Sequence, residues 1–520
     1  MKVLKNILKP IVRSSGYLLQ RILIVALLPV LAHAQQTEKV ELIKAGSLEG
    51  IETKAERKVK LIGDVVFKQG SMFLYCDSAL QYPATNRVET YGHVRMVQGD
   101  TLSLTCKTLA YDGNTKQAVA SGNVILKDNT MYLETDRLHY DRNTKIAYYT
   151  NGGLIKDKEN LLTSKMGSYH TDLKTVQFKK NVKLVNDVKQ YKIDADTLEY
   201  NTFSKVATFR GPALLTSKDG VVEGHETGSY NTVSGVMYVK GRSKINNGKQ
   251  IVEADKIDYD EVKQIGIAIG RAKLSSPSDS VQIEGDKLIY NRATGVSKVL
   301  GKPVFKGTQG KDTLFITSDT MVHIRKEDKL RTKVLEEYLK LYYHVKIFKA
   351  GMQGRCDSLI YNGNDSMITM FGNPVLWNGK SQLTADTIKL FIKNGQMHKM
   401  FMNVNAFIVM EDTIGNFNQV KGRKMEASFK ENKLKSVFVD GNSESVFFVL
   451  EGDSLTTGMN RSICSRIVMA MENDTIKRVS FLAKPEAKFI PPHQLQEPDK
   501  RLKGFLWRKE EKPDREDIPR

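Results

Sequence analysis

A short pattern that recurs about every 30 residues constrains the fold of this chain more than any other feature of its sequence. It places an Asp four residues before a Tyr, an apolar residue two before the Tyr and a turn after it, as in Asp-Arg-Leu-His-Tyr at 136–140. The tyrosines in this phase are Tyr82, Tyr111, Tyr140, Tyr169, Tyr200, Tyr230, Tyr259, Tyr290 and Tyr361. The first eight are 29–31 residues apart, and Leu390 continues the phase 29 residues after Tyr361. Such regularity predicts an array of structural repeats.

The residue types within a repeat indicate β-structure. A Gly lies eleven residues after many of the tyrosines, and apolar and polar residues alternate around it with period two, as at 236–245. That period is typical of strands, not of helices. Asp or Asn follows most of the tyrosines and favours a tight turn, while a Gly inside an apolar stretch fits a bulge or corner between two sheets. We expect two or three short strands per repeat, with the Tyr as a packing residue.

One repeat cannot cover its own apolar face, so the repeats must stack. We therefore predict an all-β protein, an elongated stacked β-jelly roll or solenoid, in one array or two tandem arrays. The phase breaks once, because His323 and Tyr361 are 38 residues apart. This break predicts a first array at 35–323, a charged insert or joint at 324–345 and a second array at 346–483.

The charged insert has two interpretations. It is either a surface loop in a continuous stack or a joint between two rods. The apolar residues that follow its charged run have a spacing that also fits a short helix; they are Leu330, Val334, Tyr338 and Leu341.

Both ends of the chain differ from the array. Residues 1–34 have a basic start, an apolar run at 22–31 and Ala-His-Ala at 32–34, which predicts a cleavable secretory signal peptide. The alternative of a membrane anchor is disfavoured, because ten apolar residues cannot span about 30 Å of hydrocarbon. The last segment, 484–520, is rich in Pro and charge, and is expected to be extended or partly ordered. Within it, Gly-Phe-Leu-Trp-Arg at 504–508 is either a docking motif or a segment packed loosely on the last repeat.

Composition narrows the function classes. The 520 residues include 79 Lys and Arg against 59 Asp and Glu, a net charge of +20, of which +15 remains after residues 1–34 are removed. A basic excess favours an acidic partner, but export and the lack of a basic stripe with aromatics argue against nucleic acid. No common catalytic or nucleotide-binding motif is present. Asp194 and Asp196 could form a glycosidase pair, but Asp196 occupies a repeat position, so we predict no enzyme, no cofactor and no metal site.

The four cysteines are Cys76, Cys106, Cys356 and Cys464. Cys76 and Cys106 are thirty residues apart and nearly in phase, so they could form a disulfide between neighbouring repeats in an oxidising compartment. The alternative is two buried free thiols, kept apart by intervening strands.

The number and phase of these units resemble the OstA-like or LptA-like family, the periplasmic β-jelly-roll proteins of lipopolysaccharide transport. The likeness is clearest at 222–231 (Val-Glu-Gly-His-Glu-Thr-Gly-Ser-Tyr-Asn), which continues to Val-Lys-Gly at 239–241, and at 122–126 (Gly-Asn-Val-Ile-Leu). It covers roughly residues 40–460, as in a long form with tandem copies. The resemblance implies a V-shaped or slightly open jelly roll whose apolar interior shields lipid acyl chains. It offers no catalytic residues to carry over.

The resemblance also implies cargo, partners and a location. The expected cargo is lipopolysaccharide or a similar envelope glycolipid. The expected partners are other transport-bridge components and a separate outer-membrane barrel protein, joined through edge strands, with end-to-end self-association as a further expectation. The chain would then act in the periplasm, alone or in association with the outer membrane.

The apolar residues two before the Tyr are our candidates for the wall of a lipid groove, because they should face inward. They are Leu138, Leu198, Ile257, Leu288 and Leu359. The alternative is that they belong to an ordinary closed core, as in a structural or adhesive envelope solenoid without lipid cargo.

Overall fold

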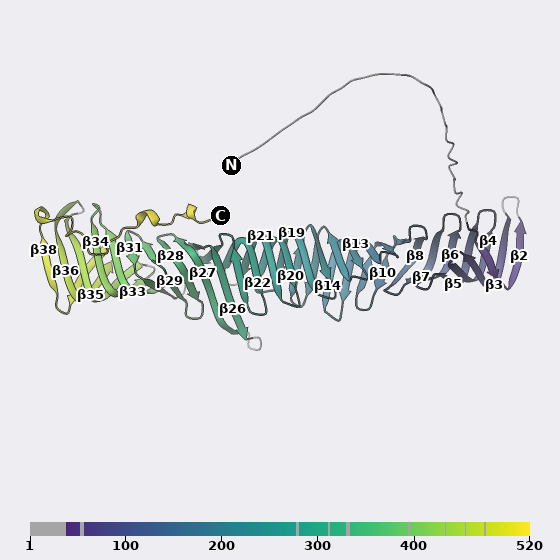
Figure 1. The fold of residues 1–520 in the computed structure, drawn as a ribbon, viewed down its shortest axis with the longest axis horizontal. Coiled ribbons are helices and arrows are strands. Elements are labelled where there is room, and N and C mark those ends of the chain that lie inside the picture. Colours follow the sequence, from purple (N-terminus) through teal and green to yellow (C-terminus); the bar gives the residue numbers. More distant parts are fainter. Residues whose placement is uncertain are drawn as a thin grey trace, which may run out of the picture.

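The computed structural model describes residues 38–519, except 53–56, 277–279, 310–311, 329–332, 394–395, 432, 453 and 473–474. The predicted signal peptide lies outside these residues. The described part is nearly all strand, in one antiparallel sheet drawn out along a single axis (Figure 1). The predicted elongated all-β stack is therefore confirmed.

The strands of the N-terminal half are, in chain order, β1 (Glu41–Lys44), β2 (Ser47–Glu52), β3 (Arg57–Gln69), β4 (Met72–Tyr82), β5 (Arg87–Gln98), β6 (Leu102–Asp112), β7 (Gln117–Lys127), β8 (Tyr132–Asp141), β9 (Ile146–Tyr149), β10 (Gly153–Lys156), β11 (Leu161–Ser164), β12 (Met166–His170), β13 (Thr175–Asn186), β14 (Tyr191–Asn201), β15 (Val206–Arg210), β16 (Ala213–Ser217), β17 (Gly220–Gly224), β18 (Thr227–Asn231) and β19 (Val236–Asn246).

The strands of the C-terminal half are β20 (Ile251–Asp260), β21 (Ile265–Ser276), β22 (Val281–Asn291), β23 (Val296–Leu300), β24 (Val304–Gln309), β25 (Asp312–Thr317), β26 (Thr320–Asp328), β27 (Lys333–Lys349), β28 (Met352–Asn362), β29 (Met367–Phe371), β30 (Val375–Asn378), β31 (Ser381–Thr384), β32 (Thr387–Lys393), β33 (Gln396–Glu411), β34 (Phe417–Lys430), β35 (Lys433–Glu451), β36 (Leu455–Glu472), β37 (Thr475–Leu482) and β38 (Glu486–Ile490). Three short 3₁₀ helices follow: η2 (Pro492–Gln494), η3 (Lys509–Glu511) and η4 (Arg515–Asp517).

Each pass of the chain bends in the middle, so the sheet is folded over on itself. In β7 the bend lies at Gly122 and Asn123, which both have positive φ (80° and 50°) and interrupt the register with β8. Gly adopts this conformation without strain, which confirms the predicted role of the repeat Gly as a corner. Where the interruption is longer, the two halves are separate strands, such as β9 and β10. We call the half that carries the Tyr arm A and the other half arm B; in β8 they are residues 137–141 and 132–135.

The repeat Asp lies on the outer side of this corner. Asp255, for example, pairs with Arg271 at 2.6 Å, and Asp77 lies 2.8 Å from His93. These side chains are largely exposed and hold neighbouring corners together, which agrees with a structural role for the recurring Asp rather than a catalytic one.

The tyrosines form a continuous row of cross-strand neighbours on the inner face of arm A. The row alternates Tyr with smaller residues and runs Tyr111, Ala118, Tyr140, Ala147, Tyr169, Val176, Tyr200, Ala207 and Tyr230. Large rings fit beside small side chains, so the alternation lets the row pack closely. Tyr82 is an exception, because Gln81 pairs with Val88 and Tyr82 falls one residue outside the row.

The described residues of the charged insert form a long hairpin, not a helix; Leu330 lies outside the described residues. β26 and β27 pair from Thr320 to Asp328 and project beyond their neighbours (Figure 1). Charged residues that face each other across the two strands stabilise this hairpin. Lys326, for example, forms an ion pair with its cross-strand partner Glu336 at 2.8 Å. The helical interpretation of the spacing was therefore wrong. The division into two arrays at this point stays a prediction.

The Pro-rich tail is extended and packs back along the molecule. We call residues 491–519 the strap. From the end of β38 the strap runs along the stack toward β27 (Figure 1). It covers outward-facing apolar side chains of arm B, which form a second cluster outside the main core; its buried members are Phe407, Val409, Val446, Met459, Ile490 and Leu502. Residues 504–508 lie in this strap, with Phe505 and Trp507 packed against Phe417 of the same chain.

Candidate functional site

The interior of the folded sheet is one long apolar core. The five groove candidates all lie in it, with side chains 0–1% exposed: Leu138, Leu198, Ile257, Leu288 and Leu359. They share arm A with the tyrosine row and face the opposite arm. Their role as walls of a lipid groove stays a prediction, since a packed core contains the same residues.

One small apolar cavity interrupts this packing. It lies where arm B is formed by β16 and β17, and residues that line it include Phe209, Leu215, Val222 and Met237. The ring of Phe209 fills the space beside Gly224, where a side chain would collide with it. This cavity lies beside the ring of Phe209, within the apolar interior.

The free ends of the two arms meet along a polar line that we call the seam. Its arm B members are hairpin residues at near-regular intervals: Gln69, Gln98, Asp128 and Asp157. Each accepts a hydrogen bond from a tyrosine hydroxyl of arm A about 40 residues later, from Tyr111, Tyr140, Tyr169 and Tyr200 respectively. The row tyrosines therefore have two roles, because their rings fill the core and their hydroxyls close its mouth.

Basic side chains of arm A complete the seam. Arg142 donates to both Gln69 and Gln98, at 3.1 and 3.2 Å. Lys174 and Lys205, each five residues after a row tyrosine, form an ion pair with the facing carboxylate at 2.8 Å. Farther along, Arg292 pairs with Asp219 at 2.9 Å.

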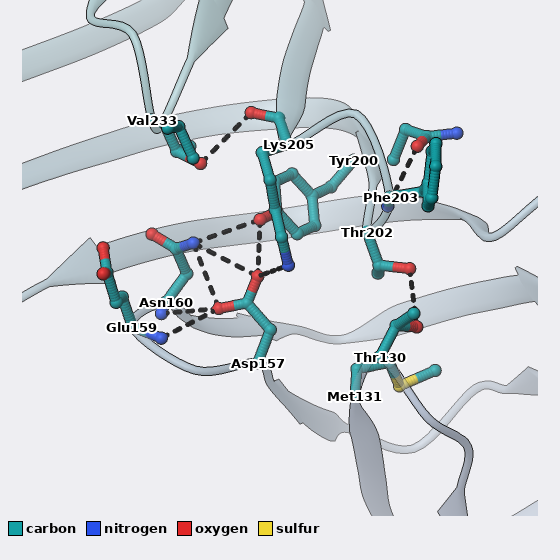
Figure 2. Close-up of polar contacts among 12 residues, drawn as sticks. Thr130, Met131, Asp157, Glu159, Asn160, Tyr200, Thr202, Phe203, Lys205 and Val233 are labelled. Atoms are coloured by element: carbon teal, nitrogen blue, oxygen red, sulfur yellow. Dashed lines mark hydrogen bonds and ion pairs between the residues drawn. The ribbon is translucent and has the colours of Figure 1, made fainter.

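Asp157 is the most fully bonded seam residue (Figure 2). Its side chain is 1% exposed and accepts hydrogen bonds from Tyr200 at 2.6 Å and from Lys205 at 2.8 Å. The backbone N–H groups of Glu159 and Asn160 donate to its other oxygen at 3.1 and 2.8 Å. Burial raises the pKa of Asp157, but these donors outweigh it, and the pKa lies below its usual range.

Asp128 repeats this arrangement one repeat earlier. Its side chain is fully buried and accepts from Tyr169, from Lys174 and from the backbone N–H of Thr130. Burial raises its pKa, yet the Lys174 ammonium and the other donors hold the net pKa below the usual value. Burial and the adjacent carboxylate raise the pKa of Tyr169, so it stays a donor.

These lowered pKa values set the pH dependence of the seam. A carboxyl group with a lower pKa in the folded state contributes stability above its unfolded pKa of about 3.9, and that stability is lost as the pH falls through the folded value. We expect the seam to be intact from about pH 5 to 8 and to weaken below about pH 4. Amide hydrogen exchange around the seam in the wild type and in Asp157→Asn should differ clearly at pH 7, and the difference should shrink as the pH falls below about 4. A difference that is unchanged between these pH values would contradict this assignment.

The possible disulfide between Cys76 and Cys106 is not formed in this structure. Cys76 in β4 and Cys106 in β6 are buried free thiols, because β5 pairs with both strands and lies between them. Strands two positions apart are separated by about 9–10 Å, beyond the roughly 7 Å that a disulfide bridges. Burial raises the pKa of each thiol to about 12. The structure thus agrees with the alternative of two buried free cysteines.

The seam residues of arm B were not predicted. Their spacing of 29–30 residues in Gln69, Gln98, Asp128 and Asp157 is a signal in the sequence, but the residue type changes from Gln to Asp. Among the residues placed by the structure, no cluster of three or more His, Cys, Asp or Glu could hold a metal ion. No helix in that same part of the chain is long and apolar enough to cross a membrane.

Two segments of the chain match protein families. Residues 37–196 match the model of the OstA-like protein family, and residues 306–396 match that of the LptA/(LptD N-terminal domain) LPS transport protein family. These two segments are therefore similar to the OstA/LptA-like family. The resemblance inferred from the repeats is thus confirmed.

A solved structure is similar to part of this chain. It is the crystal structure of LptH, the LptA homologous periplasmic component of the conserved lipopolysaccharide transport device from Pseudomonas aeruginosa. The two chains are 13% identical, and the similarity covers 24% of this chain and 82% of LptH, with a TM-score of 0.20. No curated protein matches the chain.

Proposed function

We propose that this chain is a periplasmic component of lipopolysaccharide transport that shields the acyl chains of its cargo during passage to the outer membrane. The observation that carries the proposal is the long apolar interior of this chain, which two arms enclose and which only side chains and turns close. Two segments of the chain are also similar to families of lipopolysaccharide-transport proteins. Burial of acyl methylenes there would contribute about 0.8 kcal/mol each. Cargo enters when the arms separate, and the basic surface accepts the phosphates and acidic sugars of the head group.

The ends of the stack support assembly with other bridge components. β1 and β2 both pair with β3, and β37 and β38 both pair with β36, so each end of the described sheet presents strand edges. Open edges can add a strand from another chain through main-chain hydrogen bonds. A bridge component or an outer-membrane barrel protein would bind there, or a second copy of this chain.

Photocrosslinking at native leucines tests the proposal. Photo-leucine incorporated throughout the protein in cells should crosslink to lipopolysaccharide at interior positions such as Leu138, Leu198 and Leu288. The matched control is Leu173, which is 63% exposed on a turn. Mass spectrometry would locate the adducts. Crosslinks at Leu173 alone, or at no leucine of a folded protein, would exclude an internal conduit.

A closed structural solenoid of the envelope is the second candidate. It is favoured by the 0–1% exposure of the groove candidates, which is the burial of an ordinary core. In that case the interior carries no cargo, and the same experiment gives crosslinks within the protein only.

A further inference from the structure

The tyrosine row loses its hydroxyl groups toward the C-terminus. After Tyr361 the row continues through Ile368, Leu390 and Met400, each the cross-strand neighbour of the one before. Beyond Met400 it passes to Ala427 and then through Val437, Met469 and Val479. None of these side chains can donate a hydrogen bond across the mouth. The seam contacts described above lie between Gln69 and Arg292.

Arm A ends in this region with an apolar margin that we call the lip. It consists of three cross-strand pairs next to hairpin ends: Ile392 with Met397, Phe429 with Leu434, and Met471 with Ile476. Met397, Phe429, Leu434 and Met471 belong to the main core, yet they keep 6–9% exposure, whereas the seam residues Tyr169 and Tyr200 are 0% exposed. The margin of the core is therefore apolar here, whereas polar groups close it in the N-terminal half.

The interior behind the lip is rich in methionine. Of the thirteen methionines that the described residues contribute to the main core, eight lie between Met370 and Met471. Met400, Met402 and Met425 line successive strands of arm A and are 1–3% exposed. Methionine is unbranched and flexible, so it can re-pack around a linear apolar chain with little strain. The Tyr and Ala row of the N-terminal half has much less freedom.

Lysine side chains lie at the same hairpin ends. Lys393, Lys430 and Lys433 are exposed, and none forms an ion pair with another residue of the described structure. In the seam, by contrast, Lys174 and Lys205 are paired with buried carboxylates. An apolar edge flanked by free ammonium groups suits a molecule with acyl chains and an anionic head.

We propose that acyl chains of the cargo enter and leave the interior laterally at the lip, with the phosphates or carboxylates of the head group on Lys393, Lys430 and Lys433. The N-terminal seam stays closed during this step. This inference rests on the proposed transport function and locates the entry site of the cargo at the lip.

Photo-methionine at the native positions tests the placement without any substitution. The full-length labelled protein would be incubated with purified lipopolysaccharide and illuminated. We expect adducts at Met397, Met400 and Met471, and at least tenfold fewer at Met72 and Met96 of the N-terminal core. Adducts mainly at Met72 and Met96, or equally at both groups, would overturn the lip and leave the transport function standing. No adduct at any methionine, together with no adduct in the photo-leucine experiment, would overturn both.

Charge reversal tests the head-group contact. Lys393→Glu, Lys430→Glu and Lys433→Glu in one protein should lower the amount of bound lipopolysaccharide several-fold. The control is Lys127→Glu, at an exposed strand end in the N-terminal half, and circular dichroism would verify the β-fold of both. Equal retention by the triple variant and the control would overturn the assignment of these lysines.

Discussion

Replacing Asp157 by Ala should lower the local opening free energy of the seam by about 3–5 kcal/mol, because removing one partner of a buried ion pair leaves the other without compensation. The substitution leaves Lys205 without its carboxylate and Tyr200 without its acceptor. Unfolding of a repeat array need not be two-state, so amide hydrogen exchange is the suitable measurement. Exchange in peptides spanning 154–205 should become at least 100-fold faster, as about 1.4 kcal/mol corresponds to a factor of ten.

An exposed pair in the adjacent repeat provides the control. Lys145 and Asp172 lie 2.6 Å apart, but their side chains are 46% and 53% exposed. Ion pairs of this kind contribute about 0–1 kcal/mol, so Asp172→Ala should change exchange little. If the two variants behave alike, the seam does not hold the arms together.

Deleting the strap should have the second large effect. A chain that ends after Ile490 leaves Phe407, Val409, Val446 and Met459 on an open sheet face. Contiguous exposed apolar surface promotes association. We expect concentration-dependent self-association in sedimentation velocity and a lower thermal midpoint for the C-terminal half.

Two buried glutamines explain why the strap binds in one register. The side-chain amide of Gln419 donates to the carbonyl of Lys500 at 2.8 Å and accepts from the N–H of Leu502 at 2.8 Å. Gln382 bonds Leu506 and Arg508 in the same way, both at 2.7 Å. Each glutamine thus satisfies two backbone groups of an extended segment that has no strand partner.

A shorter deletion is the matched control for the strap. A chain that ends after Lys512 keeps both glutamine contacts and Leu502. It loses the last turn, with the ion pair from Asp517 to Lys346, the contact of Arg515 with Phe315 and the buried Ile518. It should remain monomeric with a nearly unchanged midpoint. If both truncations stay monomeric and equally stable, the strap does not protect the face beneath it.

Much of the fold was predictable because it depends on local chemistry repeated many times. The period of two, the Asp or Asn after Tyr and the corner Gly each act within a few residues, and the 29–31-residue phase multiplies them. Gly122 illustrates this, since its positive φ and its corner position follow from its place in the repeat. The conformation of β27 was harder to predict, because the spacing of Val334 and Tyr338 fits a helix as well as a strand. Its pairing with β26 makes it a strand.

The sequence by itself determined that the chain is a stack of β-repeats with one buried face, and its phase and motifs indicated the family. Tertiary structure alone decided how that face is closed. The seam joins residues 41–73 positions apart, and the strap joins residues 81–171 positions apart. In the sequence, Asp157 cannot be distinguished from an ordinary turn residue, because its partners Tyr200 and Lys205 reach it only in the folded chain. The physical reason is that periodicity records the local conformation of each strand, whereas the contacts across the mouth and along the strap depend on how the whole sheet folds over.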